Sequence, residues 1–254
     1  MNNPLYEKLI QDAKDDYQHN PRISANGSVE LVWDGELIDL CREINLWTYW
    51  QGRNYDPDTS ETKYLLVGQD WGNPYGHQDT GSSVNIEAMN NNEDVPYIME
   101  RTTANEAASP TDYKLVDLFA EIGIPNIDTK RYSNLFFTNF CLGYRTGTGS
   151  GGMTLKLLMQ DAEYFQMLVD ILKPEHILCL GQLVSKAVVK TLCNERLKSC
   201  SFNSLVDLGI SYTYAGKGFT SKIHPLFHPG FFGIKNRKGF FPQHLRDWSK
   251  ILNE

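Results

Sequence analysis

Four short apolar runs, each followed directly by polar residues or glycine, constrain the fold of this 254-residue chain more than any other feature. These runs are residues 63–68, 133–139, 176–181 and 222–228. Runs of this length and composition are typical of strands buried on both faces of a parallel sheet. Apolar residues at helical spacing occupy the segments between them, at 111–122, 154–172 and 183–192. This alternation predicts an α/β fold, with a parallel sheet covered by helices on both faces.

The first sixty residues are predicted to form an N-terminal helical part packed on that sheet. Helical spacing is clearest at Leu37, Leu40, Cys41, Ile44 and Trp47. No linker rich in Pro, Gly or Ser divides the chain, so we expect residues 1–254 to form a single domain.

Composition argues against several classes of protein. No apolar run approaches the roughly 20 residues of a membrane-spanning helix, and the N-terminus lacks the apolar region of a signal peptide. We therefore expect a cytoplasmic protein without a membrane partner. The five cysteines form no CxxC pair, and His224 and His228 are about 13 Å apart along a strand, too far to share one metal ion. Neither a metal nor another cofactor is expected.

The charge distribution is uneven. The chain has a net charge of -7, which is unfavourable for a polyanionic partner. Residues 217–250, however, carry seven cations against the single anion Asp247, a local charge of +6 that leaves -13 for the rest of the chain. This stretch is interpreted either as a surface that faces phosphate or as a solvated basic helix, and composition alone favours neither.

Ligands of parallel sheets bind beyond the carboxyl ends of the strands, so the residues that follow the apolar runs are the candidate site. After the first run come Gly68, Gln69 and Asp70, and then Trp71 and Gly72. Asp70 is a candidate base or electrostatic stabiliser. An aspartate in this position is also common as a turn residue or helix cap, and both interpretations stay open for Asp70 alone.

Two further side chains end strands in the same way. Asn139 ends the second run, and its planar amide complements a pyrimidine edge that presents a carbonyl beside an N–H. A buried asparagine that caps a turn is an equal alternative. His228 ends the fourth run, where an imidazole can donate to a carbonyl oxygen as negative charge builds on a departing base.

In combination, Gly-Gln-Asp, Thr-Asn and His-Pro after these runs resemble the motifs of the uracil-DNA glycosylase superfamily. Gly68-Gln69-Asp70 resembles the opening of the water-activating motif of family one. The spacing that follows is similar to the single-strand-selective family, which has Gly-Pro-Phe-Gly, Thr-Gly, Asn-Leu-Cys and Lys-Gly-Trp. The corresponding residues are Gly72, Pro74-Tyr75-Gly76, Thr80-Gly81, Asn139-Phe140-Cys141 and Lys238-Gly239-Phe240.

The resemblance implies a three-layer α/β/α sandwich around a four-stranded parallel sheet. It also implies a monomeric DNA glycosylase that flips uracil or a related damaged pyrimidine out of single-stranded or mismatched DNA and hydrolyses its N-glycosidic bond. Asp70 would orient the water and His228 would stabilise the leaving base. The implied base-binding residues are Gly68, Gln69, Trp71, Gly72, Tyr75 and Asn139, and the implied DNA contacts are Lys235, Arg237 and Lys238.

Some residues depart from that pattern. Trp71 and Gly72 stand where family one continues with Pro-Tyr, so we hypothesise extra room beside the base. No phenylalanine follows Gly81 to stack on it. The main alternative is a catalytically silent binder of nucleic acid or a nucleobase with the same fold. An unrelated α/β-hydrolase is disfavoured because the G-x-S-x-G motif is absent.

Overall fold

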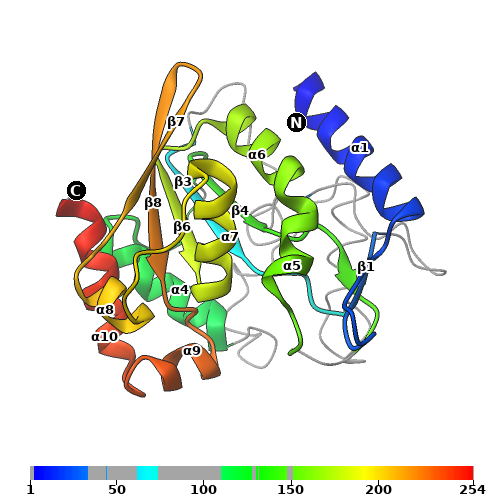
Figure 1. Cartoon of the computed structure of the whole chain (residues 1–254). Helices are drawn as coiled ribbons and strands as arrows, with labels where there is room; N and C mark the ends of the chain where they lie inside the picture. The colour runs from blue at the N-terminus through cyan, green and yellow to red at the C-terminus, as the bar shows by residue number, and fades with distance from the viewer. Residues whose placement is uncertain are drawn as a thin grey trace.

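The structure is a computed structural model that describes residues 3–33, 44, 62–73, 110–127, 130, 132–147 and 151–253. Its centre is a mostly parallel sheet with the strand order β4-β3-β6-β8-β7 (Figure 1). The five strands are β3 (Tyr64–Gly68), β4 (Leu135–Asn139), β6 (His176–Leu180), β7 (Tyr212–Gly216) and β8 (Phe219–Leu226). The described part of the chain is therefore mixed α/β, as the sequence predicts.

Helices pack on both faces of this sheet (Figure 1). One face is covered by α1 (Pro4–His19), α5 (Leu155–Leu158), α6 (Ala162–Leu172) and α7 (Gln182–Cys193). The opposite face is covered by α4 (Pro110–Glu121) and α10 (Phe241–Ser249), and the shorter helices are η1 (Met159–Asp161), α8 (Phe202–Asp207), α9 (Phe231–Asn236) and η2 (Lys250–Asn253). Within the described residues, no helix combines the length and the hydropathy that crossing a membrane would need.

Alternation along each strand explains why helices cover both faces. In β3, Leu65 and Val67 belong to the hydrophobic core beneath α6 and α7. Tyr64 and Leu66 belong to the second core, beneath α4 and α10. Successive side chains of a strand point to opposite faces, so a continuous apolar run fills two cores at once. The short apolar runs in the sequence are thus explained by burial on both sides.

All four predicted strands are confirmed and are parallel to one another. The expected count of four is wrong, because β7 adds a fifth strand antiparallel to β8 at the edge of the sheet. A tight turn joins the two, with Gly218 in the left-handed region at φ +81°. Buried and exposed residues alternate in β7, unlike in the central strands, so a search for continuous apolar runs does not find it.

Other elements also differ in detail from the prediction. The helix expected over residues 154–172 is divided into α5, η1 and α6. Helix α1 lies in the predicted N-terminal helical part, whereas residues 37–47 lie outside the described residues except for Ile44, which is buried. A second, small sheet was not predicted; it joins β1 (Arg22–Ile23), β2 (Glu30–Val32) and β5 (Tyr144–Arg145).

A buried carboxylate at the break in the predicted helix connects these parts. Asp161 is fully buried and accepts hydrogen bonds from the Tyr17 hydroxyl, from Nε of Arg22 at 2.8 Å and from the backbone N–H of Leu142 at 3.0 Å. These donors come from α1, from β1 and from the segment that follows β4. Buried charges persist only where they are paired and hydrogen-bonded, so Asp161 makes the three segments depend on one another.

We expect Asp161→Ala to lower the free energy of unfolding by about 3–5 kcal/mol, because it leaves the buried Arg22 without one of its two carboxylate partners. Urea denaturation measures the loss. Asp12→Ala is the matched control, since its pair with Lys8 is exposed and contributes about 1 kcal/mol or less. Equal unfolding midpoints for the two variants would contradict a structural role for Asp161.

Candidate functional site

The candidate residues lie at the carboxyl edge of the sheet. Gly68 and Asn139 are register partners at the ends of β3 and β4, and Asp70 follows two residues after Gly68. His228 follows β8, which β6 separates from β3. Neighbouring strands are about 4.8 Å apart, so β3 and β8 are about 10 Å apart. The structure thus brings Asp70 and Asn139 to the ends of adjacent strands and places His228 at the same edge, two strands away.

Asn139 is packed tightly against the backbone of Gly68. Its side chain is nearly buried, with the residue 7% exposed. A Cβ atom at Gly68 would lie 2.2 Å from Oδ1 of Asn139, so this position has room for glycine alone. Among the described residues, no group forms a hydrogen bond with the side-chain amide of Asn139. Buried amides are normally paired, so this one keeps capacity for a ligand.

Asp70 forms an ion pair with Arg145, which was not among the residues predicted from the sequence. Arg145 of β5 donates from Nε to Oδ1 at 2.7 Å and from Nη2 to Oδ2 at 2.9 Å. The two side chains are 7% and 5% exposed for Asp70 and Arg145. The hydrogen bonds with Asp70 raise the pKa of Arg145 above its usual value. This is a two-point, charge-assisted contact, among the strongest that side chains form.

Further contacts fix the orientation of this ion pair. Nε2 of Gln69 donates to Oδ2 of Asp70 at 2.7 Å, and Nη1 of Arg145 donates to the carbonyl oxygen of Gly151 at 2.8 Å. A carboxylate has roughly four acceptor positions, two on each oxygen. Partners among the described residues occupy three positions of Asp70, which leaves one on Oδ1. Arg145 lies in a two-residue strand without any periodic pattern, so no signal in the sequence could have paired it with Asp70.

The rest of the loop after β3 is partly described. The Trp71 ring packs on Tyr144, with centroids 4.7 Å apart, and its backbone forms an isolated bridge with that residue. Gly72 is exposed, and a Cβ atom there would meet no atom within 4 Å. The expectation of extra room beside a base at Gly72 stays a prediction. Tyr75, the other predicted base contact, lies outside the described residues.

His228 is set up as a neutral hydrogen-bond donor. Its Nδ1 accepts the backbone N–H of Gly230 at 2.9 Å, so the neutral ring carries its proton on Nε2. The residue keeps part of its surface in solvent, yet the surrounding protein desolvates the ring. This desolvation, followed by the positive charge of Lys114, lowers the pKa of His228 below its usual value. The imidazole is therefore neutral at pH 7.

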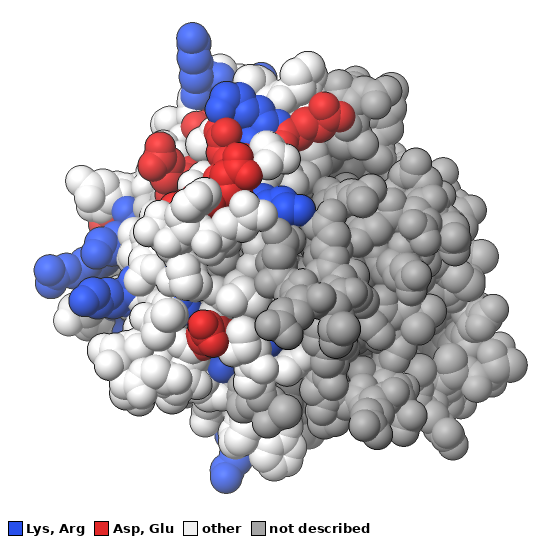
Figure 2. Space-filling model, turned by 90° about the vertical axis from the view of Figure 1, so that its right-hand side faces the viewer, with Lys and Arg blue, Asp and Glu red and all other residues white. Residues whose placement is uncertain are grey.

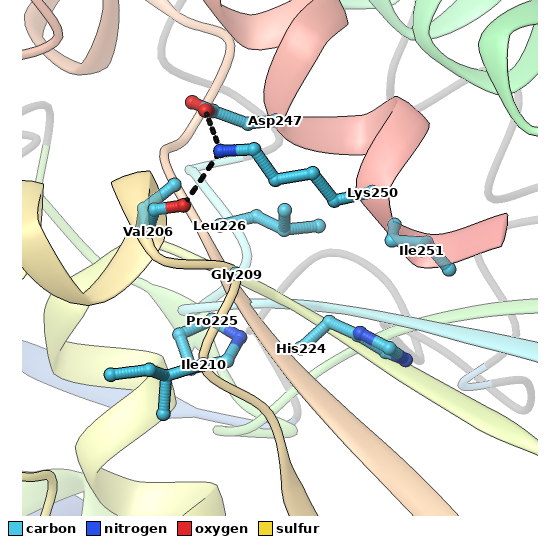
Figure 3. A pocket seen from close by; sticks show the side chains of 9 residues that line it. All are labelled: Val206, Gly209, Ile210, His224, Pro225, Leu226, Asp247, Lys250 and Ile251. Atoms are coloured by element: carbon cyan, nitrogen blue, oxygen red, sulfur yellow. Dashed lines mark hydrogen bonds and ion pairs between the residues drawn. The ribbon is translucent and has the colours of Figure 1, made fainter. Parts of the chain in front are cut away.

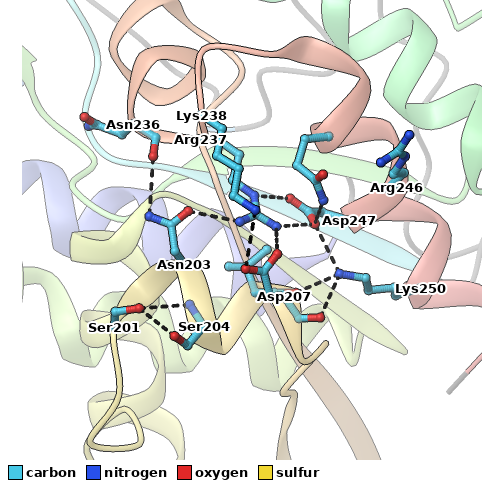
Figure 4. Close-up of polar contacts among 12 residues, drawn as sticks. Ser201, Asn203, Ser204, Asp207, Asn236, Arg237, Lys238, Arg246, Asp247 and Lys250 are labelled. Carbon is cyan, nitrogen blue, oxygen red and sulfur yellow. Dashed lines mark hydrogen bonds and ion pairs between the residues drawn. The ribbon is translucent and has the colours of Figure 1, made fainter.

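The expected DNA contact at Arg237 needs correction. Lys235 and Lys238 are exposed, as a contact with phosphate requires, but Arg237 is fully buried. Its guanidinium contacts both carboxylate oxygens of Asp247 at 2.7 and 2.8 Å and also Asp207 at 2.7 Å (Figure 4). The sequence shows that Arg237 is charged but not whether it is buried. Its two acidic partners, Asp207 and Asp247, make burial of the guanidinium possible. Arg237 thus joins α8, α9 and α10 rather than facing solvent.

Exposed aromatic side chains flank the two exposed lysines, Lys235 and Lys238. Phe231 and Phe232 are 73% and 69% exposed and contact each other edge to face, with centroids 5.4 Å apart. Phe240, at the start of α10, is also exposed. We refer to residues 231–240 as the aromatic–cationic segment. Its first two aromatic residues directly follow His228-Pro229-Gly230, so the segment adjoins the candidate site.

Two other surfaces are less suited to a nucleobase or nucleic acid. On the face drawn in Figure 2, acidic and basic side chains lie next to one another over its upper part. A pocket between α8, β8 and α10, which includes His224 and Lys250, has a volume of about 20 Å³ (Figure 3). That space accepts a single water molecule, not a base.

Comparison with models of known protein families finds no match for this chain, and a search of curated proteins finds none either.

We expect Arg237→Ala to lower the free energy of unfolding by about 3–5 kcal/mol, because the buried Asp247 loses its principal partner. Urea denaturation measures the change. Lys235→Ala is the control, since this exposed neighbour should change stability by less than about 0.5 kcal/mol. If the two variants unfold alike, Arg237 does not hold the three helices together.

Proposed function

We propose that this protein is a DNA glycosylase with a uracil-DNA glycosylase-like α/β/α sandwich. Its substrate is uracil or a related damaged pyrimidine in single-stranded or mismatched DNA, and it acts as a monomer. The observation that carries the proposal is the placement of Asp70, Asn139 and His228 at one edge of the parallel sheet, in the strand positions that the motifs imply. The proposed chemistry follows from the hydrogen-bond donors and acceptors that each side chain has available.

Asn139 reads the base. Its amide is nearly buried and has no partner among the described residues, so it can accept from the pyrimidine N–H and donate to the adjacent carbonyl. A site built to hydrogen-bond a polar edge discriminates strongly, because a wrong base leaves buried groups unpaired. Gly68 supports this role by leaving space for the amide.

His228 stabilises the leaving base. When the N-glycosidic bond breaks, negative charge develops on a carbonyl oxygen of the base. The proton on Nε2 of His228 can be donated to that oxygen as a hydrogen bond, and the lowered pKa keeps the ring in this neutral form at pH 7. A donor fixed in advance stabilises developing charge without having to reorganise.

Asp70 orients the attacking water through the acceptor position that remains on Oδ1. The proton of the water passes to this carboxylate as the hydroxyl joins the sugar carbon and the base departs. Arg145 holds the carboxylate in one orientation, which favours positioning of the water. Its positive charge also opposes the attraction of Asp70 for the positively charged sugar.

That opposition supports the second candidate function, a binder with the same fold that does not hydrolyse. In such a binder the pair of Asp70 and Arg145 is only structural. Substitution of Asp70 distinguishes the two candidates, because only the enzyme depends on the charge of Asp70 for turnover.

The aromatic–cationic segment supplies contacts with DNA. Exposed aromatic rings stack on bases of any sequence, and Lys235 and Lys238 meet phosphates. The exposed Phe231 and Phe232 suit splayed or single-stranded bases, which cost less to unstack than paired ones.

The experiment that tests this function is release of base from labelled single-stranded and mismatched oligonucleotides, followed by alkali to reveal abasic sites. We expect Asp70→Asn and His228→Ala each to lower the rate by about 100-fold or more. Asp70→Asn is preferred to alanine because the amide keeps one oxygen that accepts a hydrogen bond from Arg145, so the guanidinium loses its counter-charge but not all of its hydrogen bonds.

Thermal unfolding of each variant checks that the fold is retained. Release of no base by the wild-type protein, while the oligonucleotide remains bound, would replace the enzyme with the silent binder. Absence of both release and binding would reject both candidates.

We expect Gly68→Ala to lower base release at least about tenfold, because the added Cβ would lie 2.2 Å from Oδ1 of Asn139 and must displace the amide. Gly147→Ala is the matched control, since a Cβ there meets no atom within 4 Å. Rates of release and thermal unfolding are measured for both. A fully active Gly68→Ala variant would show that Asn139 does not read the base.

A further inference from the structure

A surface groove lies away from the candidate site, between α5, α7 and the segment that follows α7. Its volume is about 620 Å³, within the range of roughly 300–1,000 Å³ that is usual for small-molecule sites. Lys186 and Lys190 of α7 and Arg196 of the following segment line it, together with Leu155 of α5 and with Leu197. Three different parts of the chain thus contribute to one concave surface.

The cations of this groove lack ion-pair partners in the part of the chain that the structure describes. Lys186, Lys190 and Arg196 are exposed, and none forms an ion pair among the described residues. The two lysines are four residues apart, so they share one face of α7, and that helix contains no Asp or Glu. Like charges at this spacing repel each other on a helix. The position of Lys190 in the last turn is favourable to the helix dipole, but this does not account for Lys186 or Arg196.

One acidic residue, Glu195, is among those that line the groove. Three cations and one anion give a lining charge of +2, in a chain whose net charge is -7. A concave, cationic surface of this kind concentrates anions locally. The charge that would balance it is close to that of one phosphate monoester, which carries about -1.5 to -2 at pH 7.

Beneath the cations the groove is apolar. Leu155 and Leu197 are half-buried and pack against the main hydrophobic core, so their exposed surfaces are held rigidly. Asn194 adds a side-chain amide beside the cationic residues. Apolar lining with a few polar groups is usual for sites that bind small organic ligands. An inorganic anion, by contrast, would need only the cationic side chains.

We propose that this groove binds a small phosphate monoester whose organic part has an apolar face. Lys186, Lys190 and Arg196 meet the phosphate, and the organic part lies on Leu155 and Leu197. Nucleoside monophosphates and sugar phosphates share this chemistry. The proposal is independent of the glycosylase function, since none of these residues belongs to the sheet edge that carries Asp70 or His228.

The test is isothermal titration calorimetry of the full chain with a nucleoside 5′-monophosphate, a hexose 6-phosphate and inorganic phosphate. We expect at least one of the two monoesters to bind at least about tenfold more tightly than inorganic phosphate and than its own dephosphorylated form. Binding confined to the nucleotide identifies a nucleotide site, and binding confined to the hexose phosphate identifies a sugar phosphate site.

Three single variants locate the binding. We expect Lys190→Glu to weaken it by about tenfold or more, and Glu195→Gln to strengthen it about twofold or more, because removal of the acid raises the positive charge of the groove. An impaired fold cannot produce this gain. Lys217→Glu, on the exposed turn between β7 and β8, makes the same charge change outside the groove and should alter the affinity by less than about twofold.

The proposal is overturned if no monoester binds at millimolar concentration, or if Lys217→Glu weakens binding as much as Lys190→Glu. It is also overturned if an oligonucleotide that lacks a terminal phosphate binds in a manner sensitive to Lys190→Glu while the monoesters do not, because the groove would then be a contact for phosphodiesters.

Discussion

The buried carboxylate of Asp161 is the constraint on which the arrangement of the candidate site depends. It connects Tyr17 of α1, Arg22 of β1 and the backbone of Leu142. Leu142 lies in the segment between β4 and β5, so the same carboxylate fixes the path of the chain from Asn139 to Arg145. An isolated buried charge is costly, so Asp161 requires these donors. Because the donors come from distant segments, the same hydrogen bonds fix those segments relative to one another. The N-terminal helix thereby supports a site that it does not itself contribute to.

A second ion pair, between Arg145 and Asp70, fixes the loop after β3 against this segment. Arg145 is held at the end of the small sheet, and its two-point contact sets the orientation of Asp70. Trp71 packs on the neighbouring Tyr144, so two consecutive residues of the loop contact two consecutive residues of β5. This pairing and stacking fix the described part of the loop, together with the backbone hydrogen bonds that Gln69 and Trp71 accept from Cys141 and Arg145. The site thus depends on both sheets, although each candidate residue follows a strand of the larger one.

The sequence predicted the central sheet well, because burial on both faces imposes continuous apolar runs that are visible without a structure. It did not predict the edge strand β7, because the exposed residues that alternate with buried ones in this strand interrupt the apolar run. Strand ends also indicated Asp70, Asn139 and His228 as candidates. The partners of these residues were not predictable. Arg145 is 75 residues from Asp70, and nothing local distinguishes the buried Arg237 from its exposed neighbours. Contacts between distant segments are set by packing, which periodicity does not encode.

The pair of Asp70 and Arg145 has opposite consequences for binding and for hydrolysis. A carboxylate paired with a guanidinium costs less to bury than an unpaired one and favours a rigid pocket, which suits recognition of a neutral base. Hydrolysis instead requires a carboxylate that faces a positively charged sugar, and the guanidinium at 2.7 Å opposes that attraction. The free acceptor position on Oδ1 is what reconciles the two. Because Arg145 and Gln69 occupy the other three acceptor positions, a water bound to Oδ1 is held in one orientation. The ion pair thus weakens the electrostatic effect of the carboxylate but improves the positioning of the water.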